Sequence, residues 1–205
     1  MSTGRLAPTR SNLLRSRRRL ERVARGIDLL TRKRRALAAE LFGVAAPAIE
    51  ARSRVNACAA RAYAALLAAA GAGDLTALGW PSRRLEVEVT SRDTWGVESG
   101  TVRRLTPACR TLLARGQAPG VTGPAVAGAA DEFERLLELL LDAASTELLL
   151  RRLAGALERT SRQVNTLERR VAPELRGEVR RVRALLEERE REDHSRLKHL
   201  RAKRS

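Results

Sequence analysis

In residues 8–41, PTRSNLLRSRRRLERVARGIDLLTRKRRALAAEL, a regular apolar row runs through dense arginine. Apolar residues recur at alternating steps of three and four, and Ser16 and Arg34 occupy the two interrupted positions. This spacing is typical of a coiled coil, in which one stripe of a helix packs against a partner helix. The row consists of Leu13, Leu20, Val23, Ile27, Leu30, Leu37, Leu41 and Val44.

A second long apolar row occupies the C-terminal third of the chain. It comprises Leu153, Leu157, Val164, Leu167, Val171, Leu175, Val179, Val182, Leu186, Leu197 and Leu200. The steps from Val164 to Leu175 are three, four and four, an eleven-residue repeat that relaxes a left-handed supercoil. Two rows at opposite ends of one chain predict an all-α fold, a long antiparallel two-helix coiled-coil hairpin.

Two prolines, Pro47 and Pro173, fall within these helical patterns. A proline inside a helix removes one backbone hydrogen bond and crowds the preceding turn, at a cost of ~3 kcal/mol. Because the apolar pattern continues beyond both prolines, we expect a bend at each and not the end of a helix. Past Pro47 the row resumes with smaller residues, which allow a close partner helix: Val55, Ala59, Ala62 and Leu66.

The middle of the chain has a different pattern. In residues 84–98, RLEVEVTSRDTWGVE, Leu85, Val87 and Val89 alternate with polar residues, which predicts a short β-hairpin with its turn at SRDT, residues 91–94. Glycines and prolines then predict a flexible connection over 101–126. The expected organisation is a tail 1–8, a coiled-coil helix 9–72, a central head 73–128, a coiled-coil helix 129–200 and a basic tail 201–205.

The composition excludes several classes of function. No lysine follows a glycine, so a phosphate-binding loop of the GK[ST] type is absent. His194 and His199 lie five residues apart, which does not place two metal ligands on one helical face. We therefore predict no catalytic, cofactor-binding or metal-binding residues. The sequence shows neither a signal peptide nor a membrane-spanning apolar run, and a cytoplasmic location is expected.

The net charge of +16 leaves nucleic acid open as a partner. The first 40 residues hold twelve Arg or Lys and three Asp or Glu. In DNA-binding leucine zippers, however, the basic region precedes the heptads, whereas here both occupy the same residues. A solvated basic face on a coiled coil is the favoured interpretation. A basic helical nucleic-acid-binding protein is the alternative, and a self-associating coiled coil is a third possibility.

Three blocks of the chain resemble the D subunit of V-type ATP synthases. The first block is Pro8, Thr9, Arg10, Leu13, Gly26, Leu29, Leu30, Lys33, Arg34 and Leu37. The last block is Val164, Asn165, Leu167, Glu168, Pro173, Leu175, Leu186, Glu187, Glu188, Arg189, Glu190, Arg191, Glu192, Arg196, Leu197 and Lys198. Between them, Gly96 and Val97 match the family's central motif, whereas Asp93 and Trp95 depart from it.

This resemblance implies a non-catalytic central rotor shaft that couples ATP synthesis or hydrolysis to ion translocation. It implies insertion of both chain ends into a ring of catalytic A and B subunits. The F subunit would bind the flank, the funnel-shaped C (or d) subunit would bind the other end, and the membrane would be reached only through the complex. On this basis the expected ring contacts are Arg10, Arg15, Arg18, Arg22, Arg196 and Lys198.

Overall fold

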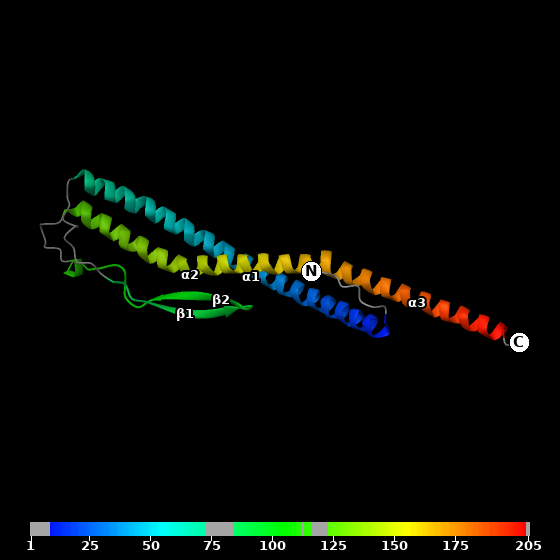
Figure 1. Cartoon of the computed structure of the whole chain (residues 1–205). Helices are drawn as coiled ribbons and strands as arrows, with labels where there is room; N and C mark the ends of the chain where they lie inside the picture. Colours follow the sequence, from blue (N-terminus) through cyan, green and yellow to red (C-terminus); the bar gives the residue numbers. More distant parts are fainter. Residues whose placement is uncertain (1–8, 73–83, 112, 116–122, 204–205) are drawn as a thin grey trace. The chain divides into compact units, whose positions relative to one another are not determined.

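A computed structural model describes residues 9–72, 84–111, 113–115 and 123–203. Figure 1 shows a mostly helical chain with a small antiparallel β-hairpin between long helices, which confirms the predicted fold class. The elements are α1 (Arg10–Gly71), β1 (Val87–Thr94), β2 (Val97–Arg104), η2 (Leu113–Arg115), α2 (Pro124–Thr166), η3 (Leu167–Val171) and α3 (Ala172–Ala202). They form two compact units, one of Met1–Arg35 with Glu158–Ser205 and one of Ala36–Leu157.

In the unit Ala36–Leu157, α1 packs antiparallel against α2. Three buried clusters follow one another, so that rising positions in α1 meet falling positions in α2. They are Leu37, Val97, Leu153 and Ala156; then Val55, Cys58, Ala62, Leu136 and Ala143; then Ala69, Val126 and Ala129. Most of these side chains are small, which allows the two helices to approach closely.

The buried row after Pro47 partly follows the predicted phase: Val55 and Ala62 are buried, and Ala59 packs against their cluster. Leu66, expected in the row, is 44% exposed, whereas Cys58 and Ala69 are buried. The buried positions step by three from Val55 to Cys58 and then by four to Ala62, so the row begins with a short step where the sequence suggested a long one. Alanine is apolar at every helical position, and composition alone does not distinguish these two phases.

The β-hairpin turns at Trp95 and Gly96, just after the predicted turn. Both residues have positive φ, 58° and 74°, as the type I′ turn of a two-residue hairpin requires. The Gly96 amide donates a hydrogen bond of 2.9 Å to the Asp93 carboxylate. Residues 91–94 belong instead to β1, where Thr94 pairs with Val97.

The other unit pairs the first part of α1 with the C-terminal helical segments. Ser16, at an interrupted position of the apolar row, is buried and donates a hydrogen bond of 2.9 Å to the Glu178 carboxylate. Arg10 reaches Glu190, so this pairing is also antiparallel. Of the predicted seam positions here, Val164, Leu175 and Val182 are buried, and Leu13, Leu20, Val23, Ile27, Leu30, Leu167, Val171, Val179 and Leu186 are half-buried.

Leu197 and Leu200 depart from the predicted seam, because their side chains are 56% and 62% exposed. The described part of α1 begins at Arg10, which contacts α3 at Glu190. Leu197 lies a further two turns along α3, beyond that contact. In the other unit, the predicted seam positions Leu37 and Leu41 are buried and half-buried.

A π-helical turn, η3, lies directly before Pro173. The Ala172 amide donates to the Leu167 carbonyl, five residues back, where an α-helix would bond four residues back. Because proline crowds the turn before it, a wider turn relieves that clash. The sequence places its three, four, four step at the same residues. The helix α1 runs through Pro47 without a break, and the bends at Pro47 and Pro173 stay predictions.

Candidate functional surfaces

The N-terminal part of α1 carries a stripe of exposed arginines. Arg15, Arg18, Arg22 and Arg25 follow one another at steps of three and four, so they share one face of the helix. Leu13 belongs to the opposite face, which packs against α3. The stripe borders a shallow surface hollow of about 520 Å³, lined by Ser11, Leu14, Arg15, Arg18, Glu21, Arg22 and Arg25. Three of the predicted contacts, Arg15, Arg18 and Arg22, are therefore brought together.

Arg10, the fourth predicted contact on α1, is engaged with α3. Its guanidinium lies 2.7 Å from the Glu190 carboxylate, and both side chains are mostly exposed, 83% and 60%. An exposed ion pair of this kind contributes only ~0–1 kcal/mol to stability. Arg10 thus lies at the edge of the helix pair. A carboxylate on another protein would have to displace only this weak ion pair with Glu190 in order to bind Arg10.

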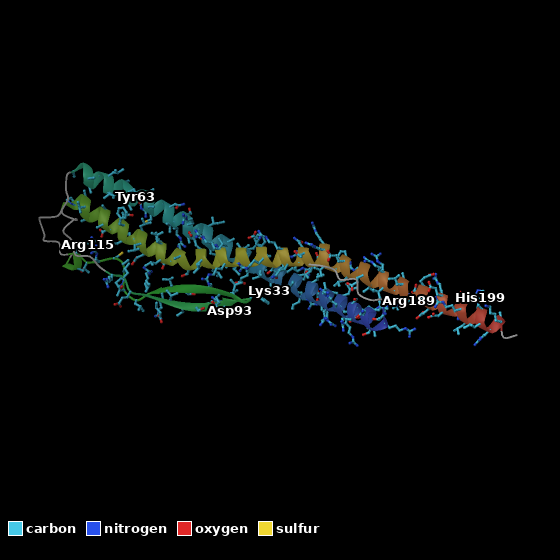
Figure 2. All side chains as sticks on the ribbon, in the orientation of Figure 1. Lys33, Tyr63, Asp93, Arg115, Arg189 and His199 are labelled. Atoms are coloured by element: carbon cyan, nitrogen blue, oxygen red, sulfur yellow. The ribbon has the colours of Figure 1, made fainter. Side chains whose placement is uncertain are left out.

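Arg196 and Lys198 lie near the C-terminal end of α3, on a segment in which every described residue from Glu187 onward is exposed. Figure 2 shows side chains projecting from this end of α3, with Arg189 and His199 labelled. Arg196 comes six residues after Glu190, the residue that Arg10 contacts. The predicted contacts on α1 and the predicted contacts Arg196 and Lys198 on α3 therefore follow one another along this unit and do not form one cluster.

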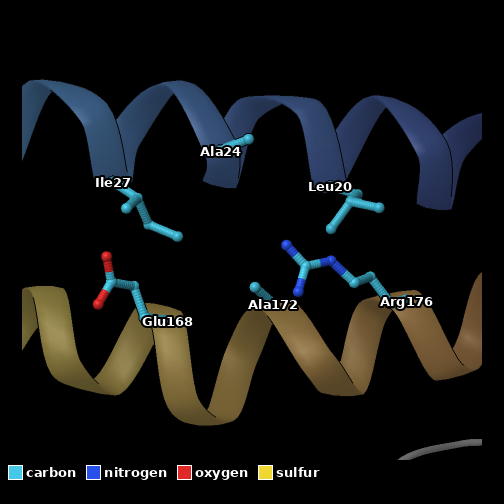
Figure 3. Close-up of a pocket in the computed structure, with 6 residues that line it drawn as sticks. All are labelled: Leu20, Ala24, Ile27, Glu168, Ala172 and Arg176. Carbon is cyan, nitrogen blue, oxygen red and sulfur yellow. The ribbon is translucent and has the colours of Figure 1, made fainter.

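Beside Ala172 the helix pair is loosely packed. A hollow of about 350 Å³ is lined by Leu20, Ala24, Ile27, Glu168, Ala172 and Arg176. Figure 3 shows the apolar side chains of α1 facing Ala172, with Glu168 and Arg176 on either side of it. This hollow adjoins the π-turn. Its small size and ordinary helix-seam lining are those of a packing defect between helices.

The β-hairpin is fixed to α2 through its second strand. The Val102 amide donates a hydrogen bond of 2.8 Å to the Ser145 hydroxyl, and the Arg152 guanidinium donates one of 2.5 Å to the Glu98 carbonyl. The register from the Trp95–Gly96 turn directs both backbone groups away from β1. Side chains of α2 thus cover the free edge of β2, and Val97 is buried beneath it.

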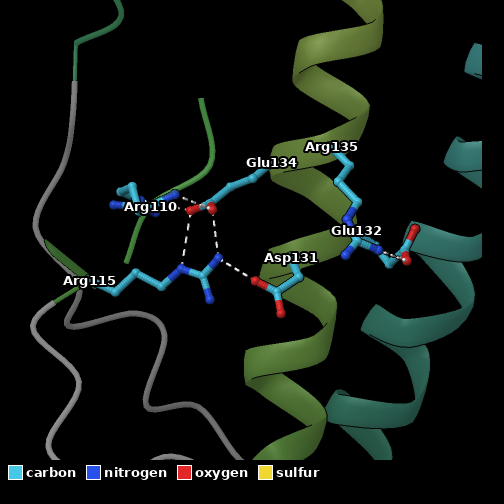
Figure 4. A network of polar contacts seen from close by, with 6 residues as sticks. All are labelled: Arg110, Arg115, Asp131, Glu132, Glu134 and Arg135. Carbon is cyan, nitrogen blue, oxygen red and sulfur yellow. Dashed lines mark hydrogen bonds and ion pairs between the residues drawn. The ribbon is translucent and has the colours of Figure 1, made fainter. Parts of the chain in front are cut away.

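A buried ion-pair network holds the segment before α2 against that helix (Figure 4). The Arg115 side chain is 2% exposed and lies 2.6 Å from both the Glu134 and the Asp131 carboxylates. Arg110 donates to Glu134 through its backbone amide and its guanidinium, both at 2.8 Å. The network neutralises a buried guanidinium, which would otherwise be strongly unfavourable.

The network shifts the titration of its members. Burial by itself raises the pKa of Glu134, but hydrogen bonds from Arg115 and Arg110 outweigh it and hold that pKa below its usual range. The hydrogen bond to Glu134 raises the pKa of Arg115. Sequence reasoning missed both residues, because Glu134 is one of many carboxylates in α2 and only the fold brings Arg115 to it.

Within the described ranges, no group of three or more His, Cys, Asp or Glu residues is arranged to hold a metal ion. None of the helices that the structure describes combines the length and the apolar character needed to cross a bilayer. The notable features are the basic stripe on α1 in one unit, and the hairpin fixed on α2 and the buried ion-pair network in the other.

Comparison with known proteins shows which protein family this chain resembles. The sequence model of a family described as the ATP synthase D subunit matches residues 12–202. A V-type ATP synthase D subunit of Anaeromyxobacter dehalogenans is 41% identical over 203 residues, covering 97% of each chain. The V-type ATP synthase D subunit of Thermus thermophilus is 38% identical, covering 97% of this chain and 88% of the relative. That of Deinococcus radiodurans is 31% identical, covering 98% and 89%.

Proposed function

This chain belongs to the D-subunit family of V-type ATP synthases, and from that premise we propose that it is the non-catalytic central shaft of such a complex. In this role it turns inside a ring of catalytic A and B subunits. Its rotation couples ATP synthesis or hydrolysis to ion translocation. The F subunit binds its flank, and the funnel-shaped C (or d) subunit binds the end opposite the chain termini.

The observation that carries this proposal is the length and continuity of α1. One helix of 62 residues runs from Arg10 to Gly71, and in each compact unit it packs antiparallel against the C-terminal helices. Paired helices with an uninterrupted backbone resist twisting better than a chain of short elements. That property suits a protein that transmits torque.

The basic stripe supports an electrostatic contact between the shaft and the ring that still allows the shaft to turn. Arg15, Arg18 and Arg22 are exposed on the face of α1 opposite its packed seam. Exposed charges attract carboxylates at long range but form weak individual pairs, ~0–1 kcal/mol each. A rotating contact needs this combination, since strong apolar contacts would hold the shaft at one angle. Arg196 and Lys198 extend the same basic character to the end of α3.

The direct test is single-molecule rotation. Cys109 is exposed and Cys58 is buried, so Cys109→Ser combined with one new exposed cysteine allows a bead to be attached at a chosen site. With the A/B ring fixed to a surface, ATP is expected to drive rotation of the bead in one direction. ATP hydrolysis by the labelled complex without bead rotation would contradict the proposal.

A disulfide between this chain and the ring provides a second test. A locked shaft is expected to stop ATP turnover, and reduction of the disulfide is expected to restore it. Continued full turnover in the locked complex would rule out a rotary role for the chain. The isolated chain should show no ATPase activity of its own.

A further inference from the structure

The π-turn η3 is a weak point of the helical backbone in the unit formed by Met1–Arg35 and Glu158–Ser205. The Ala172 amide bonds to the Leu167 carbonyl, and Pro173, which follows, has no amide hydrogen to donate. None of the five residues of η3 is buried. The turn therefore lacks the regular hydrogen bonds of an α-helix and has little apolar burial to hold it in one conformation.

The helix that packs beside η3 is weakened at the same level. Gly26 of α1 lies between Ala24 and Ile27, which both line the hollow that Glu168 of η3 also lines. A glycine inside a helix destabilises it, because glycine loses more conformational freedom on folding than any other residue. A Cβ at position 26 would meet no atom of the described residues within 4 Å, so packing does not require a glycine here.

The hollow of about 350 Å³ leaves room for the backbone to move at this level. Figure 3 shows Leu20 and Ile27 of α1 on one side of it and Ala172 on the other. Close packing resists a change of angle between elements, because contacts are lost as soon as the packed side chains separate. A loosely packed level therefore bends more easily than the packed levels beside it.

The helix pair is firmly held on both sides of η3. Toward the chain ends, Leu175 and Val182 of α3 are buried, and the Ser16 hydroxyl of α1 donates a hydrogen bond of 2.9 Å to the Glu178 carboxylate. On the other side of η3, Val164 of α2 is fully buried. Bending is thus concentrated at η3 and at the part of α1 that lies beside it.

We propose that η3 and Gly26 form a hinge at which both helices bend together. Residues 10–25 of α1 and 172–202 of α3 move as one paired block, and η3 takes up the change by exchange between π and α hydrogen bonds. Kinks in long helices occur at prolines and at π-turns, and here the two are adjacent. The hinge is a property of this chain and does not depend on the rotor role. Its movement would redirect the arginine stripe without separating the two helices.

The first experiment is hydrogen exchange of the full chain, measured by mass spectrometry. The peptide 167–176 is expected to show protection at least ~10-fold lower than the peptide 156–165, because its amides open locally at the hinge. Gly26→Ala should slow exchange in 167–176 about fivefold, although the substitution lies in the other helix. Gly43→Ala is the matched control, since Gly43 is also a helical glycine of α1 with no described atom within 4 Å of a Cβ, but belongs to the other unit.

Three results would overturn the hinge. One is equal protection of the peptides 167–176 and 156–165 in the unaltered chain. Another is a Gly26→Ala effect confined to the neighbouring residues of α1, which would mean that the two helices open independently. The third is a uniform slowing along the whole chain, which would indicate general stabilisation and not a local joint.

The second experiment removes the proline from the hinge. Pro173→Ala restores a backbone donor and relieves the crowding of the preceding turn, so exchange in 167–176 should slow at least ~10-fold. Exchange in residues 20–30 of α1 should slow with it, because the helices bend together. Pro47→Ala is the control, since α1 runs through Pro47 without a π-turn, and it should leave both peptides unchanged. Slowing in 167–176 with no change in 20–30 would contradict a shared hinge.

Discussion

The Arg115 guanidinium donates two hydrogen bonds to the Glu134 carboxylate, from Nε at 3.2 Å and from a terminal nitrogen at 2.6 Å. Arg115 comes just before the connection to α2, and Glu134 lies three turns inside that helix. Paired in this way, two buried charges fix the segment Leu113–Arg115 to α2. Removal of either partner leaves the other buried charge only partly compensated, by Asp131 in the case of Arg115 and by Arg110 in the case of Glu134.

Glu134→Leu is therefore expected to lower the free energy of unfolding by about 3 kcal/mol, because a broken buried pair costs ~3–5 kcal/mol. Urea unfolding followed by circular dichroism measures this change. Glu132→Leu is the matched control, since Glu132 pairs with the exposed arginines Arg61 and Arg135 and should cost ~1 kcal/mol or less from its ion pairs. An equal decrease in the free energy of unfolding for the two variants would show that the Arg115 network stabilises the fold no more than exposed ion pairs do.

The same pair predicts acid sensitivity. The pKa of Glu134 is lowered in the folded chain, so its stabilising effect is fully present above the ordinary glutamate pKa of ~4.3. It is lost as the pH falls through the lowered value, because the unfolded chain takes up the proton first. The free energy of unfolding should decrease below about pH 4, and less steeply in Glu134→Gln. Identical slopes for both chains would contradict this assignment.

Ser145→Ala is expected to loosen the β-hairpin on α2. The Val102 amide would lose its acceptor, and an unsatisfied backbone donor costs ~1–3 kcal/mol. Hydrogen exchange at Val102, measured by NMR, should accelerate about 5- to 150-fold, because that is the change in the local opening equilibrium to which this free energy corresponds. Thr146→Ala, one residue along, serves as the control. Unchanged protection of Val102 in Ser145→Ala would mean that β1 and β2 hold this edge without α2.

Charge reversal tests the basic stripe. Arg15→Glu, Arg18→Glu and Arg22→Glu together are expected to weaken binding to the A/B ring roughly tenfold or more at low salt, from three exposed pairs of ~0–1 kcal/mol each. The difference should shrink as salt screens the charges. Reversal of Arg54, Arg92 and Arg103, exposed in the other unit, should have little effect. Unchanged assembly and turnover in the first variant would show that the stripe is solvated and has no role in binding the ring.

The stripe also permits a check on the alternative function. A nucleic-acid-binding protein would bind a particular DNA or RNA sequence at physiological salt, with affinity falling linearly in log salt concentration. The expected result for this chain is weak binding without sequence preference. Tight, selective binding would favour the alternative over a shaft.

The paired helices could be predicted from the sequence alone, because a coiled-coil seam is specified by local spacing. Leu13, Leu20 and Leu37 recur at helical intervals, and burial of such a row requires only a partner row of the same kind. Ser16 was also a local signal, as an interrupted position of the seam, whereas the step at Leu167 predicted a relaxed supercoil and not the π-turn. The β-hairpin was predicted from the alternation of Leu85, Val87 and Val89, with its turn misplaced onto the polar residues 91–94.

Which side chains meet across long sequence separations could not be predicted from local patterns, because it depends on the path of the whole chain. Arg115 and Glu134 are ordinary charged residues in the sequence, and their pairing follows from the path of the chain before α2. The seam after Pro47 was predicted correctly at Val55 and Ala62 but wrongly at Leu66, because the neighbouring alanines fit any face, and Leu197 lies beyond the described part of α1. Periodicity specifies which face of a helix is buried, whereas the partner at each position depends on where the opposing element begins and ends.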